Sequence, residues 1–155
     1  MNPIGIIHSP FKTLDNMPIQ PGGARSVKGY IELKAELSAG LQDLDGFSHI
    51  YLIYMFHKVN RTELVVTPFM DTVPRGVFAT RSPLRPNHIG ISLVELLTVE
   101  GTTLEIQGVD VLDGTPLLDI KPFIPAFDQV TNSRSGWMTA SAGEVAEKRS
   151  DTRFI

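Results

Sequence analysis

The sequence contains no cysteine, only one tryptophan, and no apolar run long enough to cross a membrane as a helix. Without cysteine the chain can form no disulfide bond, no thiolate nucleophile and no cysteine-ligated zinc site. Its amino terminus lacks the basic start and long apolar segment of a secretion signal. We therefore expect a cytoplasmic protein that is not bound to membranes.

Motifs of several common enzyme classes are also absent. No G-x-G-x-x-G pattern follows a predicted strand and no G-x-x-x-x-G-K-[ST] pattern occurs, which argues against a Rossmann-type or P-loop nucleotide site. No G-x-S-x-G elbow of a serine hydrolase is present. The histidines show no H-x-x-x-H or H-E-x-x-H spacing, so we expect no metal site; they are His8, His49, His57 and His88.

A chain of 155 residues fits one domain. Its formal net charge of -3 argues against binding nucleic acid over the whole surface, although a local basic patch would still allow it. After residue 128 the composition changes to small polar residues. We therefore assign residues 1–128 to one domain and residues 129–155 to a C-terminal tail, in which residues 140–149 are rich enough in Ala, Glu and Lys to form a short helix.

Short strand patterns, separated by turn signals, run through most of the chain. They predict strands at residues 4–8, 27–33, 47–56, 63–69, 77–79, 89–99, 103–112 and 117–120, with one or two helical turns at residues 35–41. The segment 47–56 is the strongest of these and is apolar on both faces, so we expect it to be central and buried. The chain is thus predicted to be mainly β, a single-domain β-barrel or sandwich with short helices and no Rossmann fold.

Residues 76–90, GVFATRSPLRPNHIG, predict a short strand followed by a stiff loop, because Pro83 and Pro86 restrict the backbone on both sides of them. Arg81 and Arg85 project from this loop. Guanidinium groups on a rigid backbone lose little entropy on binding, so they suit a carboxylate or a phosphate. The alternative is that they form ion pairs within the protein, with Asp110 for example.

Polar residues also follow the ends of several other predicted strands. Because the strand ends of a small closed sheet meet at one rim, residues distant in sequence could line one pocket there. The segments concerned are 20–22, 57–58, 81–90 and 107–110.

Five segments together resemble the TsaA/TrmO family over about four fifths of the chain. They are PIGIIHSPFK, PIQPGG, DLDGFSHIYLIYMFH, GVFATRSPLRPNHIGISLVEL and DVLDGTPLLDIKPFIP, and they occur in the family's order. The core pattern ATRSP-x-RPN-x-IG is highly specific.

The resemblance implies an S-adenosylmethionine-dependent methyltransferase with a non-Rossmann β-barrel, working as a homodimer. Characterised members methylate N6 of threonylcarbamoyladenosine, the modified base beside the anticodon of tRNAs that read codons beginning with A. Carried over by position, the cofactor-binding residues would be Gln20, Pro21, Gly22, Gly23, His57, Lys58, Arg81, Ile91, Gln107, Gly108, Val109 and Asp110.

Bacterial tRNA enzymes of this family usually carry an additional C-terminal domain for which this sequence has no counterpart. The methyl acceptor is therefore less secure than the cofactor. Methylation of another small molecule or of a protein stays open as an alternative, and so does a non-catalytic cofactor-binding module.

Residue chemistry suggests a role for each of the remaining candidates. His57 is the leading catalytic base, with a structural or cofactor-contacting role as its alternative. Asn87 is a second catalytic candidate that would hydrogen-bond the target base or else cap its own loop. Arg85 and Lys12 would bind anions of the tRNA anticodon loop, and Tyr30 would stack on a base or belong to the core.

Overall fold

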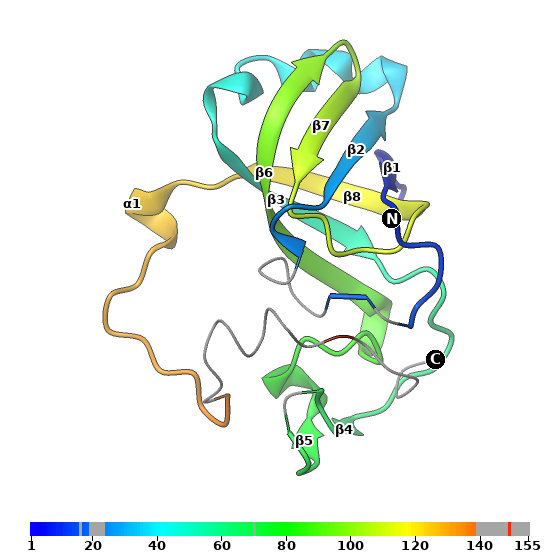
Figure 1. Cartoon of the computed structure of the whole chain (residues 1–155), viewed down its shortest axis with the longest axis vertical. Helices are drawn as coiled ribbons and strands as arrows, with labels where there is room; N and C mark the ends of the chain where they lie inside the picture. Colours follow the sequence, from blue (N-terminus) through cyan, green and yellow to red (C-terminus); the bar gives the residue numbers. More distant parts are fainter. Residues whose placement is uncertain (16, 19–23, 70, 139–148, 150–155) are drawn as a thin grey trace.

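The structure is a computed structural model that describes residues 1–15, 17–18, 24–69, 71–138 and 149. Six strands form a closed antiparallel barrel in the order β1-β2-β7-β6-β3-β8, which confirms the predicted mainly-β barrel (Figure 1). These strands are β1 (Gly5–His8), β2 (Lys28–Leu33), β3 (His49–Met55), β6 (Ile89–Glu100), β7 (Thr103–Gln107) and β8 (Thr115–Pro122). In the described ranges no helix is long and apolar enough to span a membrane.

Alternation along each strand decides which side chains fill the barrel. In β3, Ile50, Leu52 and Tyr54 are buried, while the residues between them are partly exposed. The prediction that this segment is central is correct, since it lies between β6 and β8. The prediction that both its faces are apolar core is wrong, because a closed barrel of one layer has a single interior.

Three predicted strands are shorter than expected or absent. Residues 77–79 form a 3-10 helix, Val77–Ala79, and only Val65–Val66 (β4) of the segment 63–69 is a strand; β4 pairs with β5 (Arg75–Gly76). Strand β7 ends at Gln107 because Gly108 takes a φ of 92°, and its N–H turns to the carbonyl of Val27. Residues 109–112 therefore leave the ladder.

The helical content is small, as predicted. Ala35–Leu41 is a 3-10 helix at the expected position. One short helix, α1 (Pro125–Asp128), has no sequence prediction; it starts with proline, and the Asp128 carboxylate accepts a hydrogen bond from the Ile124 N–H. The helix predicted at residues 140–149 lies outside the described residues, except for Arg149.

A second, smaller layer lies below the end of the barrel where β3 ends and β6 begins (Figure 1). It contains β4, β5 and the arginine loop, which we define as residues 80–88. Val66, Val77 and Leu84 are buried there as a separate apolar cluster, with Val59 packed against them. We call this part the loop layer.

Candidate functional site

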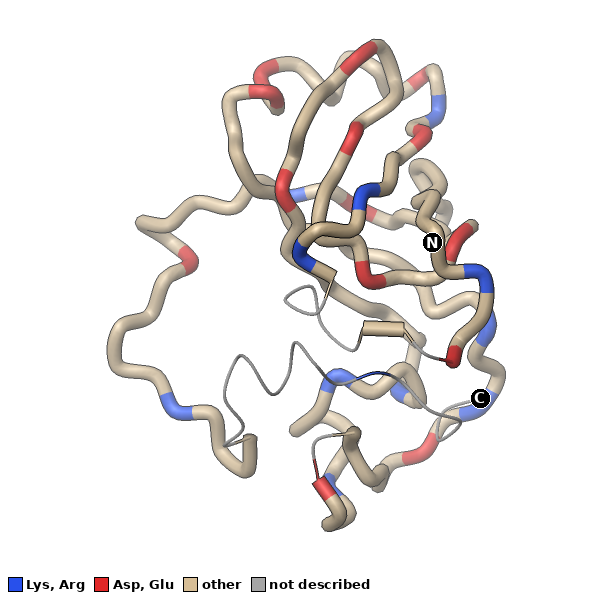
Figure 2. Tube along the Cα trace, in the orientation of Figure 1, with Lys and Arg blue, Asp and Glu red and all other residues tan. Residues whose placement is uncertain are grey.

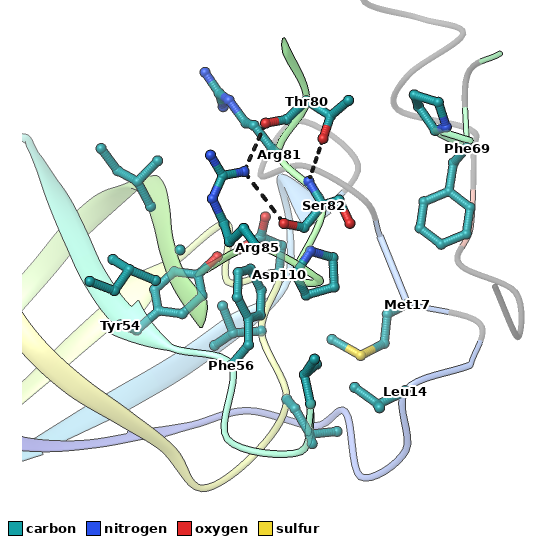
Figure 3. A pocket seen from close by; sticks show the side chains of 18 of the residues that line it. Leu14, Met17, Tyr54, Phe56, Phe69, Thr80, Arg81, Ser82, Arg85 and Asp110 are labelled. Carbon is teal, nitrogen blue, oxygen red and sulfur yellow. Dashed lines mark hydrogen bonds between the residues drawn. The ribbon is translucent and has the colours of Figure 1, made fainter. Parts of the chain in front are cut away.

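A cavity of about 960 Å³ lies between the barrel end and the loop layer. Its walls come from segments far apart in the sequence, among them the end of β3 with residues 56–59, the arginine loop, the start of β6 and residues 110–112 (Figure 3). Ser135, Trp137 and Met138 also line it. The strand ends thus meet at one pocket. Six of the predicted site residues line it: His57, Lys58, Arg81, Arg85, Ile91 and Asp110.

The arginine loop is held in shape largely by its own side chains. The Arg85 guanidinium donates to the backbone carbonyls of Thr80, at 2.8 Å, and of Ser82, at 3.4 Å (Figure 3). The Thr80 hydroxyl donates to the Val77 carbonyl and accepts from the Ser82 N–H, and the Ser82 hydroxyl accepts from the Leu84 N–H. Arg85 therefore closes the loop, in addition to lining the cavity.

The end of the loop is a 3-10 turn, Pro86–His88, with two residues in the left-handed region, Asn87 at a φ of 67° and His88 at a φ of 50°. The His88 ring forms a hydrogen bond with the Pro83 carbonyl at 3.0 Å through Nδ1. Left-handed backbone is one of the conformations that asparagine tolerates best, which explains its place here. Asn87 is exposed and is not among the residues that line the cavity.

Arg81 and Asp110 bring opposite charges to the cavity. Arg81 is exposed on the arginine loop, while Asp110 is half-buried and accepts a hydrogen bond from the Ser92 hydroxyl at 2.7 Å. Burial raises the pKa of Asp110 to about 6, although the Ser92 hydrogen bond and the Arg81 charge oppose the shift. Asp110 is therefore mostly ionised at pH 7 and becomes neutral in mildly acidic solution.

His57 follows β3 at the mouth of the cavity. Burial, and after it the neighbouring Lys58 ammonium, lower the pKa of His57 below its ordinary value. The imidazole is therefore neutral at pH 7 and has a nitrogen that can accept a proton. No group of three His, Asp or Glu side chains suited to a metal ion occurs among the described residues.

Comparisons with known proteins agree with this fold. The model of the family "tRNA-methyltransferase O N-terminal domain" matches residues 6–129. The chain belongs to this family. The resemblance to the TsaA/TrmO family is thereby confirmed.

Relatives of this chain include a Pyrococcus abyssi protein named "Probable S-adenosyl-L-methionine-binding protein", 51% identical over 99% of this chain and 83% of that protein. The tRNA (adenine(37)-N6)-methyltransferase of Mus musculus is 37% identical over 84% of this chain and 32% of its own length. A crystal structure of TrmO from Pseudomonas aeruginosa, 38% identical, superposes with a TM-score of 0.74 over 88% of this chain and 60% of that one. The chain thus spans most of the archaeal relative but about a third of the mouse enzyme.

Three of the other predicted cofactor residues, Gln107, Gly108 and Val109, do not line the cavity. The Gln107 amide donates to the Arg25 carbonyl at 3.1 Å, and the N–H groups of Gly108 and Val109 bond to the Val27 carbonyl. The Val109 side chain is in the barrel core. Gln20, Pro21, Gly22 and Gly23 lie outside the described residues.

Two of the predicted substrate residues, Lys12 and Tyr30, have partners away from the cavity. The Lys12 ammonium pairs with the Asp113 carboxylate at 2.8 Å, and the Tyr30 ring stacks on His8 with ring centres 4.5 Å apart. Tyr30 lines a separate cavity of about 360 Å³. The structure therefore does not bring them to the large cavity.

Sequence reasoning missed several residues of the site. Trp137 lines the cavity, donates from its indole N–H to the Ala79 carbonyl at 2.7 Å and lies under the Arg75 guanidinium at 5.6 Å. Tyr54 and Ser92 form a hydrogen-bonded pair with Asp110. The sequence could have indicated Tyr54 and Ser92, since each has a polar group at an inward position of a predicted strand.

Proposed function

We propose that this chain is an S-adenosylmethionine-dependent methyltransferase that binds its methyl donor in the large cavity and methylates N6 of threonylcarbamoyladenosine beside the tRNA anticodon, in the cytoplasm. Family membership supports the proposal, as do relatives named for S-adenosylmethionine binding and for tRNA adenine methylation. The observation that carries it is that the Arg81 guanidinium and the Asp110 carboxylate line the same cavity, together with aromatic and aliphatic side chains.

The charges of the cavity suit the amino-acid end of the donor. S-adenosylmethionine carries a carboxylate beside an ammonium and a sulfonium group. Arg81 can hold the carboxylate through two parallel hydrogen bonds, and the Asp110 carboxylate can attract the cationic groups. A volume of about 960 Å³ is at the upper end for small-molecule sites, which leaves room for an acceptor base as well.

The walls of the cavity suit the aromatic parts of donor and acceptor. Phe56, Phe69, Phe78 and Trp137 contribute to its lining. Such rings bind a flat adenine by stacking and burial. The exposed Phe78 side chain, at 74%, is open to a ligand from solvent.

The donor, when bound, supplies a methyl group already activated on sulfur, so the chain's residues chiefly position the acceptor and remove a proton. The N6 nitrogen of the acceptor is acylated as a urea, and its lone pair is delocalised. Its proton must therefore leave as the methyl group arrives. Neutral His57 at the cavity mouth is suited to accept this proton, as is the acceptor's own carboxylate.

Positive charge on the cavity side suits an anionic acceptor, whereas acidic residues lie along much of the barrel (Figure 2). Lys58, Arg81 and Arg85 line the cavity. With a net charge of -3, recognition would centre on one extruded nucleotide and its nearest phosphates. Binding to tRNA should accordingly weaken with salt.

We further propose that the protein works as a homodimer. Leu64, Val65, Val73 and Phe78 expose large apolar side chains in the loop layer, with exposed fractions of 65%, 61%, 47% and 74%. Large apolar side chains that are exposed to water favour association. Sedimentation equilibrium of the full chain would test this, and a monomer at micromolar concentration would contradict it.

A second function, binding of the cofactor without catalysis, is favoured by one comparison. An Archaeoglobus fulgidus protein named "S-adenosyl-L-methionine-binding protein" is 42% identical over 84% of this chain and 93% of its own length. The matched length is therefore compatible with a cofactor-binding module. Methylation of another small molecule or of a protein is the third reading.

The deciding experiment supplies methyl-labelled S-adenosylmethionine and compares tRNA with and without the threonylcarbamoyl group. We expect label only in the modified tRNA, and loss of labelling in Arg81→Ala. Lys121→Ala is the matched control, because it also removes one positive charge. The Lys121 side chain pairs with Asp119 on β8 and does not line the cavity. Equal labelling of both tRNAs would refute the acceptor, and donor binding without any labelling would favour the binding module.

A further inference from the structure

The barrel interior is aliphatic except at the end that faces the cavity. There Tyr54 of β3 and Ser92 of β6 point inward, with exposed fractions of 5% and 2%. On the same face of β3, the two inward positions before Tyr54 are Ile50 and Leu52, both fully buried. A buried hydroxyl costs free energy unless it is hydrogen-bonded, so these two groups need partners.

The partners form a chain that ends at Asp110. The Ser92 hydroxyl donates to Asp110 Oδ1 at 2.7 Å, and the Tyr54 hydroxyl lies 3.0 Å from Ser92 Oγ. Serine has one hydroxyl proton, and Ser92 uses it for the hydrogen bond to Asp110. The Tyr54 hydroxyl must therefore be the donor in its hydrogen bond with Ser92. Burial, and then the negative charge of Asp110, raise the pKa of Tyr54 well above its usual range, and the phenol therefore keeps its proton.

Gly90 makes room for this arrangement. It is paired with Tyr54 across the β3–β6 ladder, and Ser92 follows two residues later on the same face. A Cβ atom at Gly90 would lie 2.7 Å from Cζ of Tyr54 and 2.8 Å from Cζ of Phe56. The glycine thus lets the tyrosine ring lie against the β6 backbone, within reach of Ser92.

We propose that Tyr54 and Ser92 are positioning residues: their hydroxyls form a directed chain of hydrogen bonds that holds the Asp110 carboxylate, in its ionised form, toward the cationic part of a ligand in the cavity. The inference rests on the proposed function for the identity of that ligand. It assigns a task to two buried side chains, of which Tyr54 also lines the cavity.

The electrostatic surroundings of Asp110 explain why it needs this support. Burial favours its neutral form, and the groups that act against burial are the Ser92 hydroxyl, the backbone N–H of Asp110 itself and the Arg81 guanidinium. Tyr54 is the other titratable side chain that faces it. Without the Ser92 donor, the carboxylate would lose a hydrogen bond to its charged form and would titrate at a higher pH.

The test is a carboxyl-carbon NMR titration of the full chain labelled with ¹³C-aspartate, with Asp110→Asn to assign the signal. We expect Ser92→Ala to raise the Asp110 midpoint by about one pH unit and Tyr54→Phe to raise it by less. Ser92→Thr, which keeps the hydroxyl, should restore the wild-type midpoint. Tyr54→Phe keeps the ring packed on Gly90, so it serves if Ser92→Ala does not fold.

Calorimetry with S-adenosylmethionine then links the midpoint to binding. We expect Ser92→Ala to bind roughly threefold more weakly than wild type at pH 6.5 and about as tightly as wild type at pH 8.5, because its carboxylate is fully ionised only at the higher pH. If Ser92→Ala and Tyr54→Phe both lower the melting temperature but leave the Asp110 midpoint unchanged, the two residues have a merely structural role and the inference is overturned. If the Asp110 midpoint shifts in the variants as expected but the wild type binds no S-adenosylmethionine, the result would support the hydrogen-bond chain and refute the proposed function.

Discussion

The barrel interior and the loop layer hold their side chains in place by different means. The barrel packs one continuous apolar cluster contributed by all six of its strands, whereas the buried cluster of the loop layer consists of Val66, Val77 and Leu84. The loop layer compensates with hydrogen bonds from side chains to its own backbone, those of Arg85 among them. Stability should therefore depend mainly on the barrel, and the placement of charge mainly on the loop layer.

The largest effect on stability should come from the barrel, far from the cavity. Leu104→Ala in β7 removes a fully buried side chain, and we expect it to lower the free energy of unfolding by about 3–4 kcal/mol. Affinity for S-adenosylmethionine should stay within about threefold of wild type at a temperature where the variant is folded. Chemical denaturation and calorimetry measure the two quantities. A tenfold loss of affinity would show that the two regions are not separable.

Arg81→Ala should show the opposite pattern. We expect S-adenosylmethionine affinity to fall about 100-fold, since a bidentate guanidinium–carboxylate pair is lost, with little change in melting temperature. Calorimetry and thermal denaturation check this, with Lys121→Ala as the charge control. A large drop in melting temperature with normal affinity would instead assign Arg81 to an internal ion pair.

Arg85→Ala should affect both quantities moderately. Its guanidinium serves the carbonyls of Thr80 and Ser82, so we expect a loss of about 1–2 kcal/mol of stability and weaker donor binding through a looser loop. Arg85→Lys should recover only part of the stability, because an ammonium does not reproduce the guanidinium's fork. Wild-type stability in Arg85→Ala would rule out the loop-closing role.

The last prediction is a gain of stability. Asp110 is neutral at low pH in both folded and unfolded chains, and between about pH 4 and 6 only the unfolded chain loses this proton, since burial raises the folded-state pKa to about 6. Folding therefore becomes less favourable as pH rises through this window. Asp110→Asn should be more stable than wild type by up to about 3 kcal/mol at pH 8, and equally stable near pH 3. Denaturation at both pH values tests this, and equal stability at pH 8 would contradict it.

The site was only partly predictable from sequence. The Pro-rich arginine loop is visible in the residue types, and closure of a small sheet brings its strand ends together, so Arg81, His57 and Asp110 were expected near one another. The different uses of the two arginines were not, because both occupy the same kind of loop and only the fold shows which carbonyls lie within reach of Arg85. Residue type alone predicted that Lys12 and Tyr30 belong to the site. In the structure Lys12 forms an ion pair with Asp113, and the Tyr30 ring stacks on His8.

By itself, the sequence determined the mainly-β character, the main turns and the family, because alternation of apolar residues, proline and glycine act through the local backbone. Tertiary structure alone decided that Tyr54, Ser92 and Asp110, separated by 38 and 18 residues, form one hydrogen-bonded chain. A hydrogen bond depends on distances and angles set to within a few tenths of an ångström. Three features of the fold set those distances: barrel closure, strand register and the space left by Gly90. None of the three can be predicted from a local sequence pattern.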